Sequence, residues 1–282
     1  MAHSETGVDD PLLKEGMSLV AVGDSFTEGV GDPYPQTVDG TVVFRGWADR
    51  VAEHLAEHLG KVEYANLAVR GKLMRQIVTD QIPPALEMVP DLVVLSAGGN
   101  DLLRPGGDPD RLATILEHTV ARLRNAGSQV LLFTGANIGK GYMRATLGLF
   151  ARYYMNVRAI ADKHGCFLVD QWSMKVLDDA RAWDEDRLHM SSEGHRRVGL
   201  RVAEVLGVPV TEDRNEPWPT AERVGWATAR RADLVWVKDS LAPWIGRRLT
   251  GRSSGDTVTA KRPELTTLTG TKQPVKDAPS GE

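Results

Sequence analysis

Residues 20–31 read VAVGDSFTEGVG, and the change of character inside this stretch decides the fold. An apolar run over residues 18–22 ends abruptly at Gly23, Asp24 and Ser25. Short runs of Val, Ala and Leu ahead of a glycine are typical of buried parallel strands. A serine in the turn after such a strand lies at the carboxyl edge of the sheet, where open α/β sheets place their ligands. The stretch therefore predicts a parallel α/β sheet and makes Ser25 a candidate nucleophile.

Strand-like and helical segments alternate through the next 180 residues. Further strands are predicted at residues 62–67, 92–97, 130–133 and 166–169. Helices are predicted at residues 45–59, 108–125, 153–161 and 192–206. This alternation indicates a parallel sheet of five strands with helices on both faces. Right-handed crossovers then place every strand-to-helix loop on one edge of the sheet.

Composition limits the classes of function. The 282 residues carry a formal net charge of -4, which argues against a nucleic-acid partner, because domains that bind nucleic acid are usually basic. The single cysteine, Cys166, excludes an internal disulfide. The polar N-terminus does not resemble a secretory signal, and no apolar run is long enough to cross a bilayer. We therefore expect a soluble, cytoplasmic protein with no integral membrane segment.

Two glycine-containing turns follow later strands. Gly71 comes shortly after the strand at 62–67, and the sequence Gly-Gly-Asn-Asp ending at Asp101 follows the strand at 92–97. The side-chain amide of Asn100 is a neutral donor that suits an oxyanion hole. Taken alone, each stretch is equally typical of an ordinary turn.

An Asp-x-x-His sequence supplies a candidate base. Asp186 lies three residues before His189, so its carboxylate can reach the ring nitrogen Nδ1 and stabilise the imidazolium that forms on proton transfer. Taken alone, the pair is equally typical of a surface ion pair. His195 follows in a predicted helix and is expected to be structural. Because no further ligands lie at metal spacing, we expect no metal site.

Taken together, these stretches resemble the SGNH hydrolase family, also called GDSL-type esterases and lipases, over residues 17–206. The four residues that carry the resemblance occur in the family order: Ser25, Gly71, Asn100 and His189. The sequence GDSF replaces GDSL, and Phe26 falls at a packing position of the family. The turn that holds Ser25 does not have the GxSxG motif of α/β-hydrolases, which separates the two folds.

The resemblance implies a flavodoxin-like three-layer α/β/α sandwich and a serine esterase that needs no cofactor. It implies that Ser25 attacks the ester carbonyl and forms an acyl-enzyme, that His189 acts as general base, and that Asp186 orients His189. It also implies an oxyanion hole made by the backbone N–H groups of Ser25 and Gly71 and the side-chain amide of Asn100. The expected substrate is a carboxylic ester of a small or medium acyl group on an alcohol, a sugar or a lipid.

Two alternatives remain open at this point: an acyltransferase on the same scaffold, and a non-catalytic flavodoxin-like domain that binds a nucleotide. The sequence does not select the substrate. Tyr142 and Arg144, in the loop 137–150, are candidate substrate-binding residues, although this loop is equally compatible with packing on the core.

The chain divides into four parts on composition. We expect a flexible N-terminus at 1–15, the hydrolase domain at 16–210, a Trp-bearing helical extension at 211–249 and a disordered tail at 250–282. The extension carries tryptophans and arginines together, so it admits three interpretations: a helix packed on the sandwich, which we favour, a lid, or a surface for a partner or an anionic membrane.

Overall fold

The computed structural model describes residues 12–38, 40–137, 145–220, 225–243, 246 and 255–270. Its central sheet has six strands in the order β7-β6-β5-β1-β4-β8. Five of them run parallel: β1 (Met17–Gly23), β4 (Lys61–Asn66), β5 (Leu92–Ser96), β6 (Gln129–Thr134) and β7 (Phe167–Asp170). These five coincide with the predicted strands to within one or two residues at each end.

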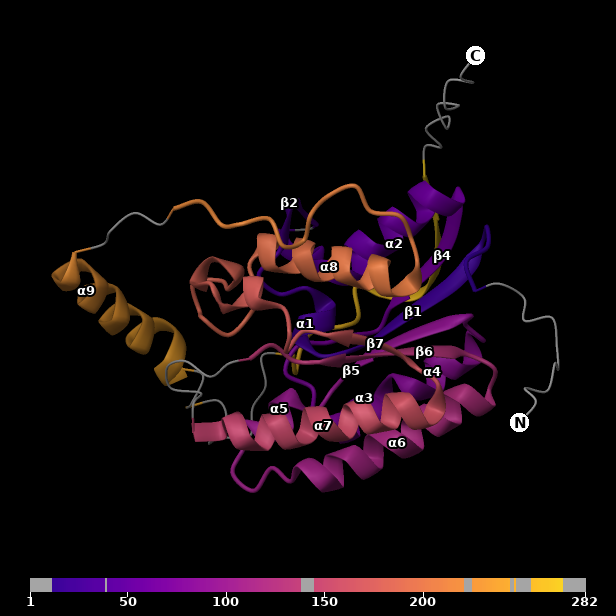
Figure 1. Cartoon of the computed structure of the whole chain (residues 1–282), viewed down its shortest axis with the longest axis horizontal. Helices are drawn as coiled ribbons and strands as arrows, with labels where there is room; N and C mark the ends of the chain where they lie inside the picture. Colours follow the sequence, from indigo (N-terminus) through magenta and orange to yellow (C-terminus); the bar gives the residue numbers. More distant parts are fainter. Residues whose placement is uncertain are drawn as a thin grey trace, which may run out of the picture.

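Helices cover both faces of the sheet, as Figure 1 shows. One face is covered by α2 (Gly46–Leu59) and α8 (Ser192–Leu206). The other is covered by α3 (Met74–Asp80), α4 (Ile82–Glu87), α6 (Pro109–Asn125) and α7 (Leu147–His164). This arrangement confirms the predicted three-layer α/β/α sandwich.

Strand β1 lies in the middle of the sheet and is buried on both faces. Leu19 and Ala21 point into the core beneath α2 and α8, whereas Val20 and Val22 point into the core on the opposite face. A strand buried in this way needs apolar residues at successive positions, which explains its continuous apolar run.

Several short elements were not predicted from the sequence, among them the helices α3 and α4. A separate antiparallel hairpin consists of β2 (Pro33–Val38) and β3 (Thr41–Phe44). The one-turn helix α1 (Ser25–Glu28) directly follows β1, and α5 (Gly99–Leu102) follows β5. Both short helices therefore lie at the carboxyl edge of the parallel strands.

The prediction of a disordered tail at 250–282 was wrong for part of that segment. Strand β8 (Arg262–Thr269) pairs antiparallel with β4 and makes the sheet six-stranded rather than five-stranded. An edge strand needs few apolar residues, because its backbone hydrogen bonds to a preformed neighbour. Its two leucines, Leu265 and Leu268, pack against the cores on opposite faces of the sheet.

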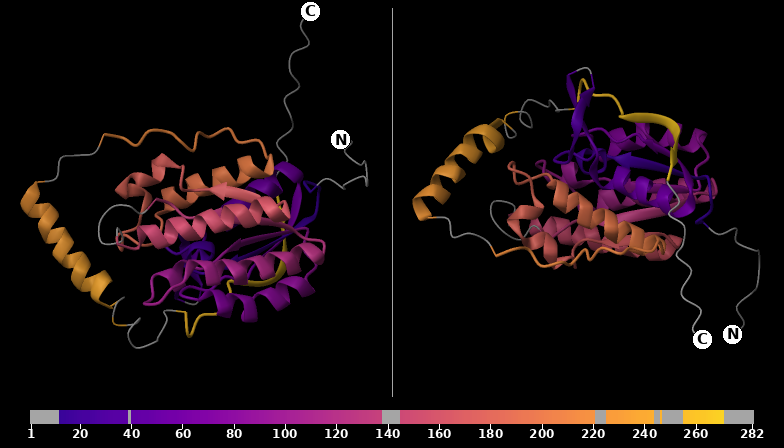
Figure 2. Two further views of the ribbon diagram at one scale, coloured as in Figure 1. Left: turned by 60° about the horizontal axis from the view of Figure 1, so that its bottom comes forward. Right: turned by 90° about the horizontal axis from the view of Figure 1, so that it is seen from above.

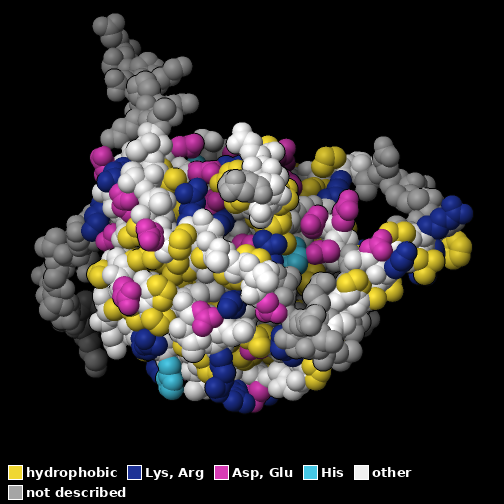
Figure 3. Space-filling view, turned by 180° about the vertical axis from the view of Figure 1, so that it is seen from behind, with side chains coloured by type: hydrophobic (Ala, Val, Ile, Leu, Met, Phe, Trp, Pro, Cys, Tyr) yellow, Lys and Arg dark blue, Asp and Glu magenta, His cyan; other side chains and the backbone are white. Residues whose placement is uncertain are grey.

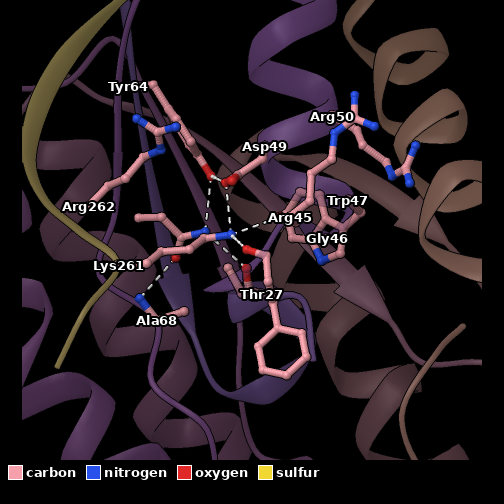
Figure 4. A network of polar contacts seen from close by, with 12 residues as sticks. Thr27, Arg45, Gly46, Trp47, Asp49, Arg50, Tyr64, Ala68, Lys261 and Arg262 are labelled. Carbon is pink, nitrogen blue, oxygen red and sulfur yellow. Dashed lines mark hydrogen bonds and ion pairs between the residues drawn. The ribbon is translucent and has the colours of Figure 1, made fainter. Parts of the chain in front are cut away.

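Lys261 anchors this strand to the body of the protein (Figure 4). Its Nζ lies 2.9 Å from Oδ1 of Asp49 and donates to the carbonyl oxygens of Phe44 and Arg45, at 2.8 Å each. Tyr64 donates to the same carboxylate at 2.7 Å. The chain end is therefore attached to α2 and β4 through a buried polar network.

Between α8 and β8 the chain passes the carboxyl edge of the sheet. It forms α9 (Trp226–Trp236) and a π-helical turn, η4 (Val237–Leu241), which lie to one side of the sandwich in both views of Figure 2. Within the described ranges, no helix has both the length and the apolar character that a membrane span requires.

Candidate active site

The turn after β1 places Ser25 at the start of α1. Asp24 is the N-cap residue, and its carboxylate accepts a hydrogen bond from the N–H of Phe26 at 3.1 Å. Gly23 permits the sharp turn, because a Cβ there would lie 2.5 Å from Oγ1 of Thr27 and 2.7 Å from the carbonyl oxygen of Ser96. The strand can thus end beside β5 and present Ser25 at the sheet edge.

The buried side chain of Gln81 holds the end of β1, and sequence reasoning missed it. Its amide accepts from the N–H of Gly23 at 2.8 Å and donates to the carbonyl oxygen of Gly23 at 2.9 Å. The side chain of Gln81 thus makes the hydrogen bonds to Gly23 that the backbone of a neighbouring strand would otherwise make. Gly23 is the residue where the nucleophile turn begins. No local pattern around Gln81 signals this role, because its partner is 58 residues away.

Asn100 connects the turns that follow three different strands. Its Nδ2 donates to the carboxylate of Asp24 and to the carbonyl oxygen of Lys72, at 3.1 Å each. Asp24 is the neighbour of Ser25, and Lys72 is the neighbour of Gly71. The structure therefore brings together Ser25, Gly71 and Asn100, which the sequence separates by up to 75 positions.

A partly buried ion pair holds the turn that contains Gly71. Glu28, in α1, accepts from the backbone N–H of Arg70 at 2.6 Å and from its Nε at 2.9 Å. The guanidinium of Arg70 also lies over the ring of Phe44. The sequence signal for this pair is the presence of opposite charges within three residues of two candidate site residues.

Asp186 and His189 form a close pair on one turn. Nδ1 of His189 lies 2.6 Å from Oδ2 of Asp186, and Oδ1 of Asp186 accepts from the backbone N–H groups of Leu188 and His189, at 2.9 Å each. Burial alone would raise the pKa of Asp186, but the hydrogen bonds and charge of His189 lower it to about 2. Asp186 is therefore a carboxylate at neutral pH and orients the imidazole.

The Asp186–His189 turn lies near the nucleophile turn. Burial raises the pKa of Asp24 to about 6, while the hydrogen bond from Phe26 and the charge of His189 act to lower it. Among the hydrogen bonds of the described residues, none joins Ser25 to His189. Such catalytic hydrogen bonds are often long before substrate binds and tighten in the reacting complex.

The loop after α1 packs against the loop that carries His189. A Cβ on Gly31 would lie 2.0 Å from the carbonyl oxygen of Met190, the residue after His189. The glycine at this position is thus required for close packing of two backbone segments, which couples the nucleophile loop to the base loop.

His195 is buried behind the site, as expected of a structural residue. Its Nδ1 accepts from the N–H of Trp47 at 3.2 Å, and its Nε2 lies 3.1 Å from the carbonyl oxygen of Val30, so the ring is neutral with the proton on Nε2. Phe26 stacks on this ring and on Trp47, with centroid separations of 6.2 and 5.4 Å. Phe26 therefore occupies a packing position, as the resemblance implied.

We expect His195 to make the protein less stable in acid. Burial lowers the pKa of His195 from 6.5 to about 4, so only the unfolded chain binds the proton between these values. Its contribution to stability is complete above pH 6.5 and is lost as the pH falls towards 4, by up to about 3 kcal/mol. Urea unfolding of wild type and His195→Gln at pH 7.5 and 4.5 measures this contribution.

The glutamine in that variant can make both hydrogen bonds of the ring but has no proton to bind. The wild type should therefore lose more stability than His195→Gln between the two pH values. Asp24, whose pKa is raised, acts in the opposite direction in both proteins, so comparing them cancels its effect. Equal losses in the two proteins would contradict the expectation.

Tyr142 and Arg144 lie outside the described residues, so their predicted role in substrate binding stays a prediction. Across the part of the chain that the structure describes, no group of three or more His, Cys, Asp or Glu side chains is placed to hold a metal ion.

Several known proteins are similar to this chain. The model of the GDSL-like lipase/acylhydrolase family matches residues 21–197, which include Ser25, Gly71, Asn100, Asp186 and His189. The chain is also 33% identical over 97 residues to the uncharacterized protein YpmR of Bacillus subtilis, a match that spans 34% of that protein and 32% of this chain.

Solved structures share the fold. The acetylxylan esterase Axe2 of Geobacillus stearothermophilus aligns with a TM-score of 0.59 and 22% identity, covering 70% of this chain and 97% of Axe2. A putative GDSL-like lipase of Parabacteroides merdae aligns with a TM-score of 0.59 and 18% identity, covering 69% of this chain and 97% of the lipase. The family match covers more than half of the chain and all of its candidate site. The chain therefore belongs to the GDSL-like lipase/acylhydrolase family.

Proposed function

We propose that this protein is a serine esterase that hydrolyses carboxylic esters of small or medium acyl groups through an acyl-enzyme on Ser25. The observation that carries the proposal is the position of the Asn100 amide. Its hydrogen bonds to Asp24 and Lys72 bring three separate turns to one point beside the nucleophile. In the proposed reaction, these turns would supply the donors around the carbonyl oxygen of the substrate.

In the proposed reaction, Oγ of Ser25 attacks the ester carbonyl carbon and transfers its proton to Nε2 of His189. The tetrahedral intermediate collapses, and His189 gives this proton to the departing alcohol. A water molecule then attacks the acyl carbon, with His189 as base, and releases the acid and free Ser25. The carboxylate of Asp186, held at 2.6 Å from Nδ1, stabilises the imidazolium in both steps.

The oxyanion would be stabilised by the backbone N–H groups of Ser25 and Gly71 and by Nδ2 of Asn100. In the structure, Nδ2 of Asn100 donates to Asp24 and Lys72, so we expect the oxyanion to share the N–H that now faces Asp24. Such donors act on charge that develops only in the transition state, which is why they raise the rate.

The Axe2 structures support this assignment of roles. Catalytic mutants of Axe2 replace a serine, an aspartate and a histidine, and the aspartate precedes the histidine by three positions, as Asp186 precedes His189 here. Axe2 acts on acetylated xylan. An acetyl group on a sugar is therefore one substrate to include among the test esters.

The proposal is tested by trapping the acyl-enzyme. Purified protein is incubated with p-nitrophenyl acetate, butyrate or octanoate and quenched in acid, and the peptides are analysed by mass spectrometry. We expect the acyl group on the peptide that contains Ser25, with release of free acid at steady state. Acyl groups on another residue would contradict the mechanism. If the acyl group passes mainly to an added alcohol, the protein is an acyltransferase rather than a hydrolase.

Asn100→Ala is expected to lower kcat by about 10²- to 10³-fold, the usual effect of removing one oxyanion donor. KM should change little, because the amide is proposed to stabilise the transition state rather than the bound ester. Steady-state kinetics with p-nitrophenyl acetate measure both constants. Asn156→Ala, which removes an exposed amide from α7, is the matched control and should have wild-type kinetics. A rise in KM alone would contradict the role of Asn100.

A further inference from the structure

The helix α9 lies outside the part of the chain that matches the family, yet it contacts the turn that carries the candidate base. It is positioned at the carboxyl edge of the sheet, on the side of α1 and α5 (Figure 1). In Figure 3, hydrophobic and cationic side chains of α9 project from the body of the protein. Among the described side chains of α9, those of Asp233 and Trp236 reach the Asp186–His189 turn.

Arg187 gives this turn an unusual backbone. Its φ of +57° is in the left-handed region, which is unfavourable for a residue with a Cβ. On the C-terminal side of Arg187, the carboxylate of Asp186 accepts from the N–H groups of Leu188 and His189. The turn that orients His189 therefore depends on a conformation that Arg187 does not favour by itself.

Two residues of α9 contact Arg187 and the residue before it. Nη1 of Arg187 lies 2.9 Å from Oδ1 of Asp233, and the guanidinium lies 4.8 Å from the centre of the Trp236 ring. Nε1 of Trp236 donates to the carbonyl oxygen of Asp186 at 2.8 Å. These contacts restrain the peptide bond between Asp186 and Arg187. They also restrain the side chain of Arg187.

We propose that Trp236 and Asp233 are positioning residues for the Asp186–His189 pair: they hold Arg187 in its left-handed conformation and so keep the base oriented towards Ser25. Neither residue touches the reacting atoms. The C-terminal segment thus completes a site whose chemical groups all come from the family domain. This inference rests on the proposed esterase function.

The test compares tryptophans on the same helix. Trp236→Phe keeps a ring over Arg187 but loses the N–H donor, and Asp233→Asn loses the ion pair. We expect the double variant to lower kcat about tenfold with KM within about twofold, since a small misplacement of a base reduces turnover. Trp226→Phe is the matched control, because Trp226 is 76% exposed, and it should behave as wild type.

A second experiment separates positioning from a general effect on stability. Arg187→Gly removes the conformational strain, since glycine adopts the left-handed region readily. In that background the same double substitution should lower kcat by no more than about twofold. Urea unfolding of the double variant should follow the wild type, because α9 contributes little to the core.

Three results would overturn the inference. One is a double variant with the kcat of Trp226→Phe, and another is an undiminished effect in the Arg187→Gly background. The third is a rise in KM with kcat unchanged, which would make α9 a substrate-binding wall. Failure of the proposed function is a different result, since the wild type would then form no acyl-enzyme. In that case the low-field Nδ1–H proton resonance of His189 still reports the orientation of the pair, and it should weaken in the double variant but not in Trp226→Phe.

Discussion

Ser25→Ala is expected to abolish ester hydrolysis, with kcat reduced by at least about 10⁴-fold. Without Oγ, no acyl-enzyme forms, and water must attack the ester carbonyl directly. His189 and the oxyanion donors remain, so a small rate above the uncatalysed reaction should persist. Hydrolysis of p-nitrophenyl acetate, butyrate and octanoate by wild type and variant, with circular dichroism of both, measures the loss.

A sharper control is whether the effects of two substitutions on the rate add together. Because Ser25 and His189 are proposed to act as a unit, Ser25→Ala combined with His189→Ala should cost about as much as Ser25→Ala alone. Ser173→Ala, which removes a hydroxyl that donates to the carbonyl oxygen of Asp170, should retain wild-type activity. Residual activity in Ser25→Ala that falls again by orders of magnitude when His189 is removed would show a different nucleophile.

Lys261→Met is expected to lower the free energy of unfolding by about 3–5 kcal/mol, the usual cost of removing one partner of a buried ion pair. Asp49 and Lys261 are only 2% and 10% exposed, so the remaining carboxylate has little access to water. The variant also loses the donors to the carbonyl oxygens of Phe44 and Arg45. Urea unfolding followed by tryptophan fluorescence at pH 7.5 measures the difference.

The matched control is the same substitution on the adjacent strand. Lys61 pairs with Glu63 at 2.8 Å, but its side chain is 43% exposed, so Lys61→Met should lower the free energy of unfolding much less than Lys261→Met does. Equal effects of the two substitutions would show that the burial of Lys261 does not determine its contribution. A wild-type stability of Lys261→Met would show that β8 is attached without this residue.

The network around Asp49 also extends towards the site. Tyr64 donates to Asp49 and accepts from the amide of Asn66, and that amide donates to the carbonyl oxygen of Thr27 in α1 (Figure 4). The C-terminal strand therefore supports the nucleophile helix from behind. We see no basis in the local sequence for predicting this support, since Lys261 and Phe44 are 217 positions apart.

The parts of the fold that were predicted correctly have local causes. A run of apolar residues such as 92–97 specifies a buried strand within its own length, and the Asp-Pro at residues 108 and 109 marks the start of α6 through a cap and a restricted first turn. Asp186 and His189 are three residues apart, so their contact was predictable from spacing. The disordered tail was predicted incorrectly for β8, because composition does not report pairing with a distant strand.

The sequence by itself determined the α/β class, the order of strands and helices, the nucleophile turn and the Asp186–His189 pair. Each of these depends on interactions within one element or one turn. Only the tertiary structure decided that Asn100 meets Asp24 and Lys72, that β8 completes the sheet and that α9 contacts Arg187. These contacts join segments from tens to hundreds of residues apart. Their partners are selected by the packing of the folded sheet and helices, and residue spacing along the chain does not encode that packing.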